Sequence, residues 1–152
     1  MTTSRSQQKE SARGLSLSLT FDAPVADSFD AIATQKGIAA WWTPLVRGAV
    51  AQGREFQLGF KGLDETIRIR VDESRKPQIV RWTVLEHSGL PEWNGTSIVF
   101  ALTELVAQKT TLHFRHNGLL PQLDCYSDCR AGWNHFLGSL AKVAAGSPGS
   151  PF

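Results

Sequence analysis

A long helical pattern near the end of the chain, preceded by a series of alternating segments, constrains the fold more than any other feature. From Asp124 to Ala145, apolar residues recur at steps of three and four, the spacing of one face of an α-helix. These positions are Tyr126, Cys129, Trp133, Phe136, Leu137, Leu140 and Ala144. Earlier segments place an apolar residue at every second position, as strands with one buried face do. One long helix must therefore cover one apolar sheet face.

Seven segments carry the strand pattern, and turn-forming residues separate most of them. The expected strands are 15–21, 46–51, 55–60, 66–71, 78–85, 97–105 and 110–116. Two short helices should follow the first strand: one begins at Pro24 and ends at Gly37, and the other covers 38–42. The later strands are closely spaced and joined by short turns, so they should form an antiparallel meander. The expected fold class is α+β, with an antiparallel sheet of six to seven strands.

Such a sheet, with one long helix on its apolar face, should curve around that helix, as the right-handed twist of strands favours. Side chains from a single helix cannot fill a concave surface completely. We therefore expect a hollow between sheet and helix, closed at one end by the short helices that carry Trp41 and Trp42. A hollow of this kind is a typical ligand pocket, apolar with a few polar groups.

The length of 152 residues suits one domain with a substantial core. Residues 1–14 are polar and should form a disordered tail, because they cannot bury enough surface to offset the entropy of ordering. The single domain should cover residues 15–145. Residues 146–152 are rich in glycine, serine and proline and should form a flexible tail, with Phe152 either docked on the body or free in solvent.

The composition excludes several classes of partner. A formal charge of +2, with scattered lysines and arginines, does not suit nucleic acid. No purely apolar run is longer than that at 38–42, which is far too short for membrane insertion. The N-terminus lacks the apolar centre of a secretory signal, which favours a cytoplasmic location. The chain could be a monomer or a homodimer.

The order and spacing of several segments resemble one known family. The segments are FDAP at 21–24, IAAWW at 38–42, GREF at 53–56, VRW at 80–82, WNGT at 93–96, TLHF at 111–114 and GWNHFLGSL at 132–140. Residues 15–140 resemble the START-related, birch-pollen-allergen-like superfamily (SRPBCC). Within it they most resemble the domain of activators of the ninety-kilodalton heat-shock chaperone ATPase.

This resemblance implies a helix-grip fold, in which a curved antiparallel sheet wraps around a long C-terminal helix and leaves an internal cavity. Relatives include lipid carriers, plant-hormone and metabolite binders and aromatic cyclases. The resemblance brings no shared set of catalytic residues. It also implies a chaperone as one candidate partner.

Aromatic side chains are the main candidates for binding a ligand, since aromatic walls suit flat or apolar molecules. With one histidine, the expected ligand-binding set is Trp42, Phe60, Trp82, Phe100, Phe114, His116, Trp133 and Phe136. The alternative is that these aromatic residues simply fill a well-packed core.

Two polar residues could add chemistry. His116 shares strand parity with Phe114, and Glu86 shares it with Trp82, so both could face the hollow as acid and base. Alternatively, they form a polar pair at the rim or point to solvent. Arg81 and His87 have the opposite parity and should face outward.

The two cysteines, Cys125 and Cys129, lie four residues apart in the same apolar sector as Trp133 and should act as small hydrophobic side chains. A metal site would need two further ligands, so we expect neither a metal nor a cofactor. A disulfide within one helical turn would strain its geometry.

Three functions remain open. The first, which the pattern favours, is binding of a small hydrophobic or amphipathic molecule or lipid. The second is a cavity enzyme of the cyclase or hydrolase type that uses His116 and Glu86. The third is a chaperone-interaction domain. The sequence contains no nucleophile elbow, phosphate-binding glycine loop or zinc-ligand cluster, which weighs against an enzyme.

Overall fold

The computed structural model describes residues 13–152, so the expectation for the N-terminal tail lies almost wholly outside the described residues. The strands are β1 (Gly14–Phe21), β2 (Val46–Gly48), β3 (Glu55–Gly59), β4 (Thr66–Arg75), β5 (Ile79–His87), β6 (Ser97–Val106) and β7 (Lys109–Asn117). The helices are α2 (Val25–Ala33), α3 (Gln35–Trp41), the 3-10 turn η1 (Pro91–Trp93) and α4 (Tyr126–Ala144).

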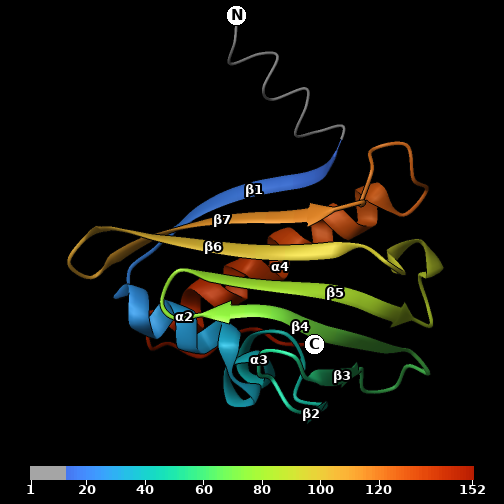
Figure 1. Ribbon diagram of the computed structural model, residues 1–152, viewed down its shortest axis with the longest axis horizontal. Helices are drawn as coiled ribbons and strands as arrows, with labels where there is room; N and C mark the ends of the chain where they lie inside the picture. The colour runs from blue at the N-terminus through green and yellow to red at the C-terminus, as the bar shows by residue number, and fades with distance from the viewer. Residues whose placement is uncertain (1–12) are drawn as a thin grey trace, which may run out of the picture.

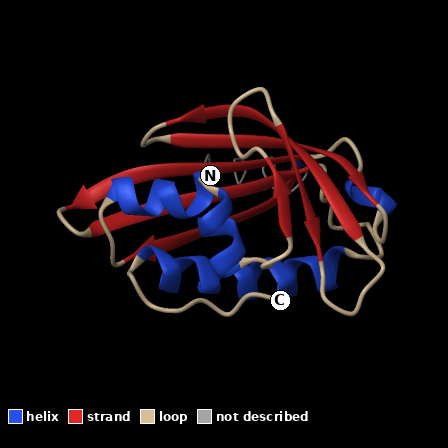
Figure 2. Ribbon diagram, turned by 90° about the horizontal axis from the view of Figure 1, so that it is seen from below, coloured by secondary structure: helices blue, strands red, loops and turns tan. Residues whose placement is uncertain are grey.

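All seven strands form one antiparallel sheet in the order β1-β7-β6-β5-β4-β3-β2 (Figure 1). Strand β1 forms one edge of the sheet and pairs with β7, where Leu17 lies opposite Phe114. Helix α4 crosses one face of the curved sheet, and α2 and α3 lie beside it at one end (Figure 2). The structure confirms the α+β class and the helix-grip arrangement.

The boundary between the two short helices differs from the expectation. Helix α2 ends at Ala33, and the side chain of Thr34 caps α3 by accepting a hydrogen bond from the Gly37 backbone N–H at 3.0 Å. Gly37 therefore lies inside α3 instead of ending α2. A Cβ on Gly37 would meet the Ala31 carbonyl oxygen at 2.3 Å, so only glycine allows the two helices to approach this closely.

The centre of the molecule is a continuous aromatic core. Trp41, Trp82, Phe100 and Phe114 are each at most 1% exposed. Trp42 stacks on Trp41 at 5.4 Å and on Trp82 at 6.2 Å between ring centroids. Replacing a buried aromatic residue of this kind by alanine typically costs about 3–5 kcal/mol.

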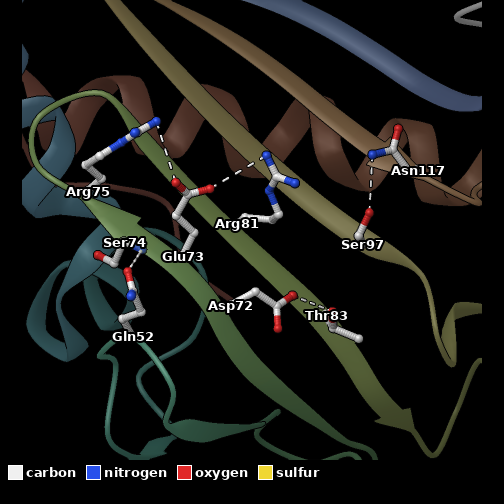
Figure 3. A network of polar contacts seen from close by, with 9 residues as sticks. All are labelled: Gln52, Asp72, Glu73, Ser74, Arg75, Arg81, Thr83, Ser97 and Asn117. Carbon is white, nitrogen blue, oxygen red and sulfur yellow. Dashed lines mark hydrogen bonds and ion pairs between the residues drawn. The ribbon is translucent and has the colours of Figure 1, made fainter.

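The other face of the sheet is polar, and its charges pair with one another. Glu73 lies between Arg75 and Arg81, and Asp72 accepts from the hydroxyl of Thr83 (Figure 3). Exposed pairs of this kind contribute little to stability. This face is therefore a polar, solvated surface, and the apolar hollow must lie on the face that α4 covers.

The C-terminal segment, for which we expected a flexible tail, forms hydrogen bonds to the body of the protein. The backbone N–H of Ser150 donates to Ser139 Oγ at 2.6 Å, and that of Phe152 donates to the Trp42 carbonyl at 2.7 Å. A Cβ on Gly149 would meet the Ala40 carbonyl oxygen at 2.4 Å, which explains the close approach of this segment. Docking brings the Phe152 ring against Phe60, with centroids 5.2 Å apart.

Candidate functional site

A pocket of about 250 Å³ opens between α4, the sheet and the C-terminal segment. Its walls come from β4, β5, η1, α4 and the loops beside them. The lining residues are Trp42, Phe60, Leu63, Glu65, Ile67, His87, Leu90, Trp93, Cys125, Asp128, Cys129, Gly132, Trp133, Phe136 and Phe152. Its size would admit a two-ring aromatic molecule or a short apolar chain.

Stacked rings form the floor of the pocket. Trp133 lies on α4 between Trp93, whose ring is parallel at 5.8 Å, and Trp42, whose ring is tilted at 5.2 Å. Phe136, one helical turn further along α4, lies 6.4 Å from Trp42. The three indoles are buried, whereas Phe152 at the rim is 51% exposed. The floor is therefore continuous with the core, and the rim faces solvent.

A β-bulge brings His87 into the pocket. Arg68 pairs with Glu86 and the next residue, Ile69, pairs with Val84, so Leu85 has no partner on β4. This extra residue reverses the alternation along β5: Glu86 is exposed and His87 is only 5% exposed. The expectation that Glu86 faces inward and His87 outward is therefore wrong, because parity assumed a regular strand.

The backbone fixes the tautomer of His87. Its Nδ1 accepts hydrogen bonds from the N–H groups of Gly89 at 3.1 Å and Leu90 at 3.0 Å, so the neutral ring carries its proton on Nε2. Within residues 13–152, Nε2 has no hydrogen-bond partner. Burial lowers the pKa of His87, and the nearby carboxylates of Glu65 and Glu92 only partly oppose this. His87 therefore offers the pocket a neutral N–H donor.

His116 lies below the pocket floor in a fully satisfied network. Its Nδ1 accepts from Trp133 Nε1–H at 3.1 Å. The Thr96 hydroxyl donates to the Trp93 carbonyl at 2.6 Å, so His116 Nε2–H donates to Thr96 Oγ1 at 2.9 Å. Burial, with a smaller effect from His87, lowers the pKa of His116 to about 3. This neutral imidazole holds the floor indoles in place.

The expected site residues fall into three groups. Trp42, Phe60, Trp133 and Phe136 line the pocket. Trp82, Phe100, Phe114 and His116 pack in the core below the lining, because the rings above them already fill that part of the concave face. Glu86 points to solvent, so the structure does not bring it together with His116 as an acid–base pair.

Both cysteines line the pocket. Cys129 Sγ accepts from Trp93 Nε1–H at 3.3 Å. Burial, with contributions from Cys129 and Glu92, raises the pKa of the Cys125 thiol to about 12, so it is a protonated, apolar part of the wall at neutral pH. Across residues 13–152, no three histidine, cysteine or acidic side chains are grouped to hold a metal ion.

Sequence reasoning did not assign several lining residues to the site. His87 was missed because the bulge at Leu85 has no sequence signal. Trp93 lies in a segment expected to be a turn, although an aromatic residue between strands could have suggested a lid. For Phe152 the sequence left two alternatives, docked on the body or free in solvent. Its packing depends on the close approach of the chain at Gly149.

The fold and the aromatic pocket define a helix-grip protein of the SRPBCC superfamily. The chain belongs to the family described as "Activator of Hsp90 ATPase homolog 1-like protein", whose model matches residues 22–145. No curated protein matches the chain. No helix of residues 13–152 combines the length and apolar character needed to cross a membrane.

Solved structures with the same fold include the Aha1 dimer from Colwellia psychrerythraea. It is 25% identical, with a TM-score of 0.75 over 87% of this chain and 96% of that one. CalU16 from Micromonospora echinospora is 19% identical, with a TM-score of 0.67 over 88% and 74% of the two chains. Protein MLL2253 from Mesorhizobium loti is 18% identical, with a TM-score of 0.69 over 85% and 96%. The latter two support the fold alone.

Proposed function

We propose that the protein binds a small hydrophobic or amphipathic molecule in the aromatic pocket. The observation that carries this proposal is an apolar pocket of about 250 Å³ whose wall includes His87, a residue only 5% exposed with its Nε2–H free to donate to a ligand. Flat rings gain from stacking on Trp93 and Trp133. An oxygen atom of the ligand would accept a hydrogen bond from His87 Nε2–H, which has no acceptor within residues 13–152.

A substitution at Gly132 provides a direct test of ligand binding in the pocket. This glycine lies on α4 in the pocket wall, and a Cβ there would have no other heavy atom within 4 Å. In Gly132→Leu, the added side chain should occupy the pocket and weaken binding of 2-naphthalenemethanol at least about tenfold, the loss expected when one buried ring contact of about 1.5 kcal/mol is removed. Binding is measured by isothermal titration and by the change in tryptophan fluorescence.

Gly138→Leu is the matched control. Gly138 lies on the same helix, also has open space beside it, and does not line the pocket. Both substitutions replace a helical glycine and should stabilise α4 by up to about 1 kcal/mol. Equal affinity of both variants for the probe, or no binding by the unmodified protein, would contradict the proposed function.

The catalytic alternative has little support in this geometry, because Glu86 and His116 lie on different sides of the sheet surface. We therefore propose binding without chemistry. The cytoplasmic location and the choice between monomer and homodimer stay predictions.

Interaction with a chaperone is the second candidate, which the family membership favours. Leu105 and Val106, at the β6–β7 turn, are 55% and 61% exposed and offer an apolar contact. We expect the protein to raise the ATPase rate of the ninety-kilodalton heat-shock chaperone, and L105S/V106S to lose this effect while keeping its melting temperature. An unchanged ATPase rate would contradict this candidate.

A further inference from the structure

The charged groups of the pocket all have the same sign. Glu65 and Asp128 line it, and no lysine or arginine does, although the whole chain has a net charge of +2. Neither carboxylate forms an ion pair with another residue of the described part of the chain. The pocket therefore has an uncompensated negative charge.

The position of Glu65 is set by its surroundings. Its side chain lies over Gly89, where an added Cβ would meet the carboxyl carbon at 2.4 Å. Asp128, which also lines the pocket, lies in the first turn of α4. Glu92, on η1, adds negative potential near His87 and Cys125. The three carboxylates thus come from the β3–β4 loop, η1 and α4, and two of them, Glu65 and Asp128, line the pocket.

The remaining polar group of the pocket does not offset this charge. His87 is neutral, because Nδ1 is engaged by two backbone N–H groups and burial disfavours a second proton. The aromatic walls act in the same direction as the carboxylates, since the negative face of an indole or phenyl ring attracts cations. Trp93, Trp133, Phe136 and Phe152 are aromatic residues of this wall, on η1, α4 and the C-terminal segment.

We propose that the pocket selects amphipathic molecules that carry a protonated amine or quaternary ammonium on a flat apolar body, and that it discriminates against their anionic analogues. This inference rests on the proposed function and names the ligand class for the same site. The apolar body lies on the indole floor, and the cationic group lies at the mouth between Glu65 and Asp128. Fatty-acid-like anions are excluded by the same two carboxylates.

Three probes with the same ring separate the charge from the apolar contact. They are 2-naphthylmethylammonium, 2-naphthalenemethanol and 2-naphthoate, each titrated calorimetrically at neutral pH and low salt. Two partly exposed charge pairs and a cation–π contact together predict that the cation binds about tenfold more tightly than the alcohol. The anion should bind at least about tenfold more weakly than the alcohol, and added salt should reduce both differences.

The double variant E65Q/D128N tests whether these carboxylates cause the selection. Its preference for the cation over the alcohol, both measured on the same variant, should fall below about twofold. The control D27N/E104Q removes the same formal charge from exposed positions outside the pocket and should keep the preference. Binding of the alcohol also shows that each variant is folded.

The outcomes separate this inference from the proposed function. If the alcohol binds and the cation has no advantage, or if E65Q/D128N keeps the advantage, the inference is overturned and the proposed function stands. If none of the three probes binds, the proposed function is overturned, and the inference with it.

Discussion

Acidification from pH 6.5 to about pH 3.5 should lower the free energy of unfolding by about 4 kcal/mol through His116 alone. The unfolded imidazole binds a proton below pH 6.5, whereas the folded one does so only below about 3. In this window the unfolded state holds the additional proton, so stability falls as pH falls, by about 1.4 kcal/mol per pH unit. Such a loss is a large part of the stability of a typical domain.

Urea unfolding across this pH range measures the effect. The control is His116→Gln, whose amide can accept from Trp133 and donate to Thr96 but does not titrate. The variant should lose the part of the pH dependence due to His116, whatever its stability at neutral pH, while the contribution of His87, whose pKa burial also lowers, is retained. Parallel pH profiles for the two proteins would contradict the assignment of His116 as a buried neutral group.

Substitution of Gly37 by alanine should destabilise the protein by about 3 kcal/mol. The new Cβ would lie 2.3 Å from the Ala31 carbonyl oxygen and 2.7 Å from its carbonyl carbon, and both are backbone atoms that cannot rotate away. The same oxygen accepts from Trp41 Nε1–H at 2.9 Å, so separating α2 from α3 also strains a buried hydrogen bond. The melting temperature should fall by roughly 10 °C.

Gly132→Ala is the matched control for this prediction. It also replaces a helical glycine, but open space surrounds the added methyl group, and the variant should be as stable as the original or up to about 1 kcal/mol more stable. Equal stability of Gly37→Ala and Gly132→Ala would show that the contact between α2 and α3 is looser than described.

The sequence was sufficient for the architecture because periodicity reports which face of an element is buried. The stripe on α4 and the alternation in the strands are properties of single elements, and together they left one way to cover the sheet. The ends of the elements were less predictable. Thr34 caps α3 and Gly37 allows α3 to approach α2 closely, and neither feature affects the periodicity of apolar residues.

The site was less predictable for two physical reasons. The bulge at Leu85 exchanged the positions of Glu86 and His87, and a single unpaired residue leaves no trace in composition. In addition, parity shows that a residue faces the concave side but not how deep it lies. Phe100 and Phe114 do face inward, yet other rings separate them from the pocket.

Trp42 is part of both the core and the pocket, since it stacks on Trp41 and Trp82 and also forms part of the pocket floor. Substituting Trp42 therefore disturbs the core as well as the pocket, whereas Leu63, Asp128 and Phe152 at the exposed rim can vary at little cost. Divergence among descendants of this chain should accordingly be concentrated at the mouth. New ligand specificities would arise by substituting the rim residues that contact the polar group of the ligand, while the indole rings of the floor stay the same.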